Sequence, residues 1–280
     1  MTHIRGGYTI LEVMIFLAIS GLIFVSAAVG VNGRQQRVQY TQSIKDFEGQ
    51  MVDVLNDVAA GYYPAPVGYE CRALGGGTPR PDFTTAGGTP VEHGASDECI
   101  SVGKAVLFNL NGNADADNFG LASLVGVRPS IVSNSKVSVE STNPILAYEA
   151  NPGNTFDLTE LKPLRFGLKV TGIYDLAAPF TSYAAIVIAS GFDGSNPASI
   201  KNGLTETRLY ALRGNLGQTM DEYANDLSGL NSTDIVKPVN GVEICVEYPG
   251  DAKKARILVG EGGVASTVRS ELDILSGLCS

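Results

Sequence analysis

A long uninterrupted apolar stretch dominates the start of the chain. Within residues 13–31 only Ser20 and Ser26 carry polar side chains, and no residue is charged. A helix rises about 1.5 Å per residue, so this stretch just spans a hydrocarbon core of roughly 30 Å. Glu12 lies at its edge. An unpaired carboxylate in lipid is costly, which marks Glu12 as a candidate functional residue.

The pattern then becomes amphipathic. Apolar residues recur at three- and four-residue steps, at Tyr40, Ile44, Phe47, Met51, Val54, Leu55 and Val58. This spacing predicts one buried helix face, and Gly61 and Pro64 follow as signals that end a helix. We therefore expect one helix over residues 8–60, facing lipid in its first half and a sheet in its second. A bare stalk or coiled coil is the alternative for the second half, because the run covers only about three heptads.

The remaining residues predict a β-rich head. Glycine and proline punctuate residues 61–98, so we expect mostly loop there. Short β-rich runs follow at 100–110, 136–140, 145–149, 164–174, 183–190, 207–212, 242–248 and 255–259. The run 183–189 is continuously apolar, as is typical of a central strand covered on both faces. With two further helices expected at 216–230 and 268–278, the fold class is α+β: a long N-terminal helix packed on an antiparallel sheet.

The segment before the apolar stretch carries a recognisable motif. This motif resembles the class III signal of type IV pilins and pseudopilins, and it consists of Gly6-Gly7-Tyr8-Thr9-Ile10-Leu11-Glu12-Val13. The resemblance implies that a prepilin peptidase/methyltransferase cuts after Gly7 and methylates the new amine on Tyr8. It also implies that Glu12 pairs with the amine of a neighbouring subunit during filament assembly. Tyr8 replaces the usual phenylalanine, and Val29 stands where many major pilins have a kinking proline.

The resemblance covers roughly residues 1–60 and assigns a function to each part of the chain. It implies a leader at 1–7, a transmembrane and assembly segment at 8–31, an amphipathic segment at 32–60 and a globular head at 61–280. The protein would be a structural subunit of a type IV pilus or pilus-like filament. Alternatives are a minor pilin or pseudopilin of a type II secretion or DNA-uptake system, or an anchored adhesin that does not polymerise.

Location and partners also follow from the resemblance. The precursor would cross the cytoplasmic membrane once with its N-terminus inside, and the mature protein would reach an extracellular pilus or the cell surface. Its partners would be membrane lipid before assembly, other pilin subunits, the peptidase/methyltransferase and an inner-membrane assembly platform. Counting lysine and arginine alone favours the reverse orientation, because Arg34 and Arg37 outnumber Arg5. The pilin-type signal overrides this count, since it must meet its peptidase from the cytoplasm.

Composition and motifs argue against several other classes of function. The formal charge of −9 repels phosphate backbones, so we expect no bulk nucleic-acid binding. The chain has no G-x-S-x-G, P-loop or H-E-x-x-H motif, and we predict no enzymatic activity and no cofactor. A run of oxygen-bearing side chains resembles a calcium loop at Asn111, Asn113, Asp115 and Asp117. It lacks the terminal glutamate, so a solvated turn is the favoured interpretation.

The four cysteines all follow the apolar stretch, at Cys71, Cys99, Cys245 and Cys279. An even number in a region expected outside the cytoplasm predicts two disulfides. Three pairings are possible, and we favour Cys71–Cys99 with Cys245–Cys279 because each pair is close in sequence. Each bridge would close a loop of about 30 residues and contribute roughly 3 kcal/mol. A metal site is less favoured, because no C-x-x-C occurs.

Overall fold

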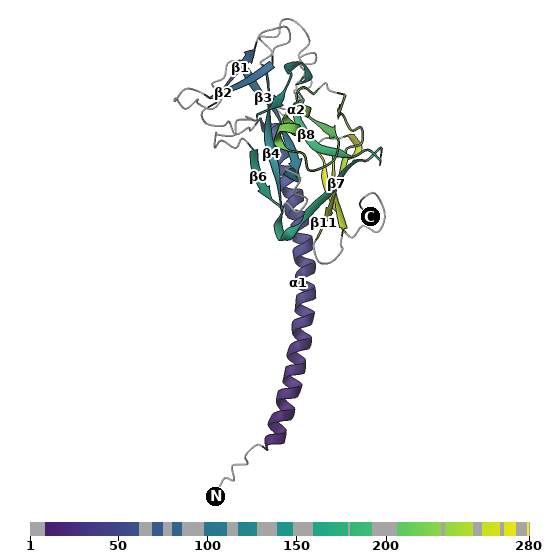
Figure 1. The fold of residues 1–280 in the computed structure, drawn as a ribbon. Helices are drawn as coiled ribbons and strands as arrows, with labels where there is room; N and C mark the ends of the chain where they lie inside the picture. The colour runs from purple at the N-terminus through teal and green to yellow at the C-terminus, as the bar shows by residue number, and fades with distance from the viewer. Residues whose placement is uncertain are drawn as a thin grey trace. The chain divides into compact units, whose positions relative to one another are not determined.

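A computed structural model describes residues 9–61, 69–74, 80–85, 98–110, 117–127, 139–147, 159–178, 180–191, 206–230, 233–248, 254–263, 266–272 and 279. The chain forms two compact units, Met1–Gln42 and Ser43–Ser280. Helix α1 spans Ile10–Ala60, which confirms the predicted long helix (Figure 1). The second unit therefore contains both the β head and the last turns of α1.

The last turns of α1 are held in the core of the head. Their buried face consists of the predicted periodic residues Ile44, Phe47, Met51, Val54, Leu55 and Val58, each at most 3% exposed. Gly61 ends the helix with a φ of 70°, a conformation that glycine adopts without a Cβ penalty, and its N–H donates to the carbonyl of Val58 at 3.2 Å. The helix therefore packs against the sheet and is not a bare stalk.

A seven-stranded antiparallel sheet forms the larger part of the head (Figure 1). Its strands are β3 (Cys99–Phe108), β4 (Asn118–Val127), β5 (Ile145–Leu146), β6 (Thr159–Pro163), β8 (Tyr183–Gly191), β9 (Glu206–Arg213) and β10 (Ile235–Val236). The order is β10-β9-β8-β3-β4-β5, and β6 also pairs with β4. Strand β8 lies between β9 and β3, and residues 183–190 are all buried, which confirms the predicted central strand.

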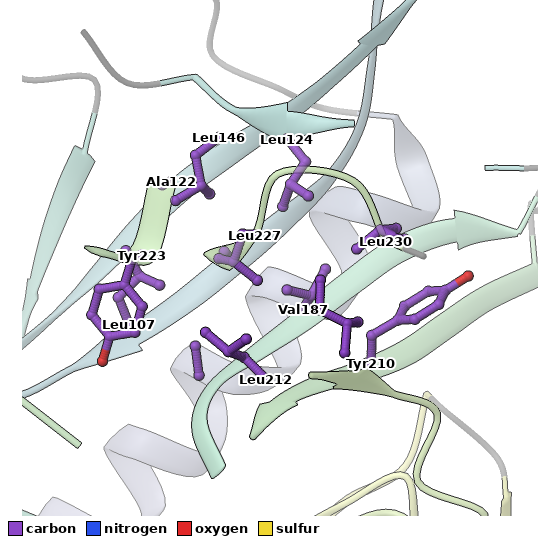
Figure 2. Close-up of a cluster of buried hydrophobic side chains, with 14 of the residues drawn as sticks. Leu107, Ala122, Leu124, Leu146, Val187, Tyr210, Leu212, Tyr223, Leu227 and Leu230 are labelled. Carbon is purple, nitrogen blue, oxygen red and sulfur yellow. The ribbon is translucent and has the colours of Figure 1, made fainter. Parts of the chain in front are cut away.

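The central strands are apolar because both faces of this sheet are covered. On one face, the ring of Phe47 from α1 packs 6.1 Å from that of Phe108 and 5.5 Å from that of Phe119. The opposite face carries a cluster that includes Leu107 and Val187, shown in Figure 2. The short helix α2 (Met220–Asp226) and the turn after it close this cluster. Successive residues of a strand thus face two apolar cores in turn, so these strands show no alternation of apolar and polar residues in the sequence.

A four-stranded antiparallel sheet completes the head, in the order β13-β12-β11-β7. Its strands are β7 (Lys169–Asp175), β11 (Val242–Glu247), β12 (Lys254–Val259) and β13 (Val268–Glu271). Register places Ile173, Ile244 and Ile257 on one buried face. The opposite face carries Glu243, Cys245, Arg256 and Glu271. The sheet is therefore apolar on one side and polar on the other, and the polar side carries the bond to the C-terminal segment, Cys245–Cys279.

Several secondary-structure predictions are wrong. Within residues 61–98, expected to be mostly loop, two strands were not foreseen: β1 (Tyr69–Leu74) and β2 (Arg80–Thr85) pair there. Strand β13 occupies 268–271, where we expected a helix, because pairing with β12 overrides a weak helical periodicity. The expected strand at 164–174 begins instead with a turn at Arg165–Gly167. Of the strand expected at 136–140, the described residues 139 and 140 belong to a 3-10 turn, Val139–Thr142.

Strand β4 was not predicted, because glycines interrupt its apolar pattern. It is nevertheless central, pairing with β3, β5 and β6. A Cβ on its Gly126 would lie 2.2 Å from Oγ1 of Thr142, so the turn that contains Thr142 packs directly on this strand. Glycine therefore marks a close approach between two segments here, not a loop.

Alkaline pH should destabilise the head through Tyr223 of α2. Its hydroxyl donates to the carbonyls of Ala184 (3.0 Å) and Phe108 (3.3 Å), and burial raises the pKa of Tyr223 to about 12. An unfolded tyrosine ionises near pH 10, so the folded state favours the protonated phenol. This contribution, roughly 2–3 kcal/mol, is complete below pH 10 and is lost as pH rises toward 12. Urea unfolding at pH 8–12 measures it, and Tyr223→Phe should lose less stability over the same range. An equal loss in Tyr223→Phe would contradict the assignment.

Candidate functional site

The N-terminal part of α1 is a continuous apolar surface. The segment Ile10–Ala27 has a mean hydropathy of 2.4, is long and apolar enough to cross a membrane, and has none of its residues buried. Large side chains such as Phe16 and Phe24 are at least 70% exposed. An apolar surface of this extent is stable only in lipid or against another apolar surface.

The two serines in this segment do not oppose burial in lipid. The hydroxyl of Ser20 donates to the carbonyl of Leu17 at 3.1 Å, and that of Ser26 donates to the carbonyl of Ile23 at 2.8 Å. Both hydroxyls thus find a partner within the helix. Since an unsatisfied polar group in hydrocarbon costs several kcal/mol, these bonds remove most of the cost of placing the two serines in an apolar environment.

Glu12 has a local partner, which sequence analysis had missed. Thr9 precedes the first turn of α1, and its hydroxyl accepts from the N–H of Glu12 at 3.3 Å. In return, Oε2 of Glu12 accepts from the backbone N–H and the hydroxyl of Thr9, both at 3.0 Å. These reciprocal bonds form a capping box, which satisfies amides left open at a helix N-terminus. The detectable signal was the spacing T-x-x-E immediately before the apolar run.

The same device recurs in the head, at the start of α2. Thr219 and Glu222 have the same spacing, and the N–H of Thr219 donates to Oε2 of Glu222 at 2.7 Å. The bonds from the backbone and then the hydroxyl of Thr219 lower the pKa of Glu222. Glu222 thus provides an internal reference for Glu12: a capping glutamate with the same bonding pattern that does not lie in an apolar segment.

The cap leaves Glu12 able to bind a further donor. Both hydrogen bonds from Thr9 end on one carboxylate oxygen, Oε2. An ionised carboxylate has about four acceptor positions, so Oε1 retains capacity for a cationic donor such as an amine. The arrangement can therefore orient a carboxylate at the edge of an apolar helix without saturating it.

Several other predicted site residues lie outside the described part of the chain. These include the cleavage and methylation positions Gly7 and Tyr8, three of the weak calcium candidates, Asn111, Asn113 and Asp115, and the side chain of Cys71. The fourth calcium candidate, Asp117, is described, and its carbonyl accepts from the N–H of Leu164 at 2.6 Å. Asp117 thus joins the start of β4 to the end of β6.

The disulfide between Cys245 and Cys279 is confirmed, with Cα atoms 5.2 Å apart. Cys99 is also in a disulfide, and its pairing with Cys71 stays a prediction. Within the described residues, one group of potential metal-ligating side chains comes together: Glu243, Cys245 and Cys279. Its two sulfur atoms are bonded to each other, whereas metal binding needs thiolates, so this group is not a metal site.

No family model, curated protein or solved structure matches this chain. The features of the molecule that bear on function are the exposed apolar helix, its capped acid and the head that continues from it.

Proposed function

We propose that the chain is a structural subunit of a type IV pilus or a pilus-like filament. One observation supports this most strongly: helix α1 has an exposed apolar segment edged by a capped acid, and its later turns form part of the core of a β head. A simple anchor requires the apolar segment alone. It requires neither the acid at the edge nor a head built around the same helix.

The proposed assembly step uses the charge of Glu12. Cleavage after Gly7 gives Tyr8 a cationic amine, and Glu12 of an incoming subunit receives the amine of its neighbour. In surroundings of low dielectric, opposite charges attract far more strongly than in water, and a lone charge is heavily penalised. The pair therefore selects one axial register. As subunits leave the lipid, the apolar side chains of Ile10–Ala27 hold neighbouring helices together through non-directional hydrophobic contacts.

The capping box gives Glu12 a role before assembly as well. A carboxylate at the edge of the bilayer is stabilised by the two hydrogen bonds from Thr9, which lower the cost of holding it there. Before assembly, the subunit can therefore remain in the membrane with the Glu12 carboxylate ionised and oriented. Pairing with the neighbour's amine then adds a partner and need not break the cap.

The proposal places the precursor in the cytoplasmic membrane with its N-terminus inside, and the mature subunit in a filament at the cell surface. The peptidase/methyltransferase and an inner-membrane assembly platform would act on it before polymerisation. The acidic head would then cover the filament. A minor pilin or a pseudopilin would use the same helix chemistry, and an adhesin that does not polymerise would use the anchor alone.

Two measurements on the native host test this proposal. Mass spectrometry of the mature N-terminus should find methylated Tyr8, and an intact Met1 would overturn the signal assignment. Sheared surface filaments should contain the chain as a main component. Trace amounts would favour a minor subunit, and complete absence from every surface or periplasmic filament would favour the anchored adhesin.

Replacing Thr9 with alanine tests how much the cap itself contributes. Loss of an N-cap side chain costs about 1 kcal/mol of helix stability, so Thr9→Ala should reduce filament yield without abolishing it. Quantitative immunoblots of sheared filaments measure this effect. Thr219→Ala removes the matching cap on α2 and should leave filament yield unchanged if the head stays folded. Complete loss of filaments in Thr9→Ala would mean that the cap, not the charge, is the essential function of Glu12.

A further inference from the structure

A buried carboxylate lies directly against the C-terminal disulfide. Oε1 of Glu243 is 2.9 Å from Sγ of Cys279, which is bonded to Cys245. Glu243 is 3% exposed, Cys279 is 5% exposed and Cys245 is 2% exposed, so the three groups are enclosed together. Burying a carboxylate is costly, and a disulfide sulfur cannot donate a hydrogen bond to it. The contact with the finished disulfide therefore gives the carboxylate no hydrogen bond.

The state that precedes the disulfide would supply such a bond. A reduced Cys279 carries an S–H, and a thiol placed where its sulfur now lies would donate that proton to Oε1 of Glu243. Thiolate, not thiol, is the attacking species in disulfide exchange, and an unperturbed cysteine ionises near pH 8.5. An adjacent base that accepts the proton therefore lets Cys279 react at a lower pH.

The charged neighbours favour this role. On β12, the guanidinium nitrogen Nη1 of Arg256 lies 3.4 Å from Oε1 of Glu243. The same guanidinium binds Glu271 of β13 through Nε (2.6 Å) and a terminal nitrogen (2.5 Å). On β7, the residue opposite Glu243 is Tyr174. Among the described residues, Arg256 is thus the cation that contacts Glu243, and its shorter contacts go to Glu271.

We propose that Glu243 is the proton acceptor for closure of the Cys245–Cys279 disulfide. In the closing step, Cys245 carries a mixed disulfide with a small-molecule or enzyme-borne disulfide oxidant. Glu243 takes the proton of the Cys279 thiol as that sulfur attacks Sγ of Cys245. The Cys245–Cys279 bond forms, the bond to the oxidant breaks, and the oxidant leaves as a thiolate with the electron pair. In this step Cys279 is oxidised and the departing oxidant sulfur is reduced; Cys245 was oxidised earlier, when the mixed disulfide formed and released the first oxidant thiol.

This role matters because Cys245 and Cys279 are 34 residues apart in the chain. Their bond ties a distant segment to the polar face of the four-stranded sheet, and it closes only once Cys279 has reached Glu243. A built-in base speeds this step. The proposal does not depend on filament formation, since it concerns the folding of any exported form of the head.

The test follows closure in the full-length protein in detergent micelles, with Cys71→Ser and Cys99→Ser so that one disulfide remains. The protein is reduced with dithiothreitol, freed of it and exposed to oxidised glutathione, and samples are trapped with iodoacetamide for mass spectrometry. Closure is unimolecular, so its rate is read where it no longer depends on glutathione concentration. Glu243→Gln is compared with Glu247→Gln, a matched change on the same strand two residues beyond Cys245. Circular dichroism checks that each variant is folded.

Glu243→Gln should slow closure at least about tenfold at pH 6.5 and accumulate glutathione on Cys245, because general-base catalysis typically contributes a factor of this size or larger. The difference should shrink toward pH 9, where the thiol ionises unaided. Glu247→Gln should match the parent. Equal closure rates at every pH would overturn the proposal. Faster closure in Glu243→Gln would also overturn it, because it would mean that the carboxylate only repels the thiolate of Cys279. If Glu243→Gln does not fold, the pH dependence of the closure rate in the parent protein decides. A tenfold fall in this rate per pH unit below pH 8 would contradict an internal base, because it would show that closure follows the ionisation of the free thiol.

Discussion

Glu12→Gln should abolish filament assembly while leaving the helix cap in place. Glutamine serves at the third position of a capping box as glutamate does, so its side-chain oxygen can keep the bonds from Thr9. What the substitution removes is the negative charge that is proposed to pair with the neighbour's amine. Leaving one member of a buried ion pair uncompensated costs about 3–5 kcal/mol, and this cost recurs at every subunit added. Sheared-filament yield from cells that express the variant should fall below detection.

The head supplies the control for this experiment. Glu222→Gln makes the same chemical change in a capping box of the same bonding pattern, at Thr219, and should not reduce filament yield. Membrane fractionation should find the Glu12→Gln protein inserted at the level of the parent, because the apolar segment is unchanged. Normal filament yield in Glu12→Gln would leave Glu12 with a capping role alone and would remove the main support for an assembly charge.

Phe47→Ala should cause the largest loss of stability among single substitutions on the buried face of α1. The ring of Phe47 is 1% exposed and contacts both Phe108 of β3 and Phe119 of β4. Truncating such a side chain costs about 3–5 kcal/mol, because transfer energy is lost and a cavity remains. The aromatic contacts add about 0.5–1.5 kcal/mol each to that burial. Urea unfolding of the full-length protein in detergent, followed by tyrosine fluorescence, should show a midpoint shift to lower urea.

Val52→Ala is the matched control for this second experiment. Val52 lies on the same turns of α1 but is 37% exposed, so its truncation should change the free energy of unfolding by less than about 1 kcal/mol. If Phe47→Ala and Val52→Ala were equally mild, the last turns of α1 would not contribute to the core of the head. The proposal that one helix serves both the membrane and the head would then lose its structural basis.

Much of the N-terminal region could be predicted because its signals are local. The extent of α1, its end at Gly61 and its buried face from Ile44 to Val58 follow from periodicity within a few turns. The capping box at Thr9 and Glu12 was equally local, since T-x-x-E is a four-residue pattern. It was missed because Glu12 was interpreted as an unpaired charge, whereas the structure gives it a partner three residues away.

Predictions failed where the decisive partner lies far along the chain. The apolar residues near 268–278 fit a helix by spacing, yet pairing with β12 makes Val268–Glu271 a strand. Strand β4 has two glycines that suggest a loop, yet it is enclosed by β3, β5 and β6, and Gly126 is needed for the approach of Thr142. Short apolar runs satisfy both helix and strand patterns, so only the backbone donors and acceptors of a distant segment decide between them.

The sequence by itself determined a lipid-compatible helix with an acid at its edge, an amphipathic continuation and a cysteine-bearing β head, because periodicity, length and charge act over neighbouring residues. Only the tertiary structure decided what surrounds the charged groups. It gave Glu12 a cap from Thr9, packed Phe47 against the rings of Phe108 and Phe119, and set Glu243 against a sulfur atom 36 residues away. Burial and proximity between distant residues set the energy of a charge or a ring, and those quantities exist only once the chain is folded.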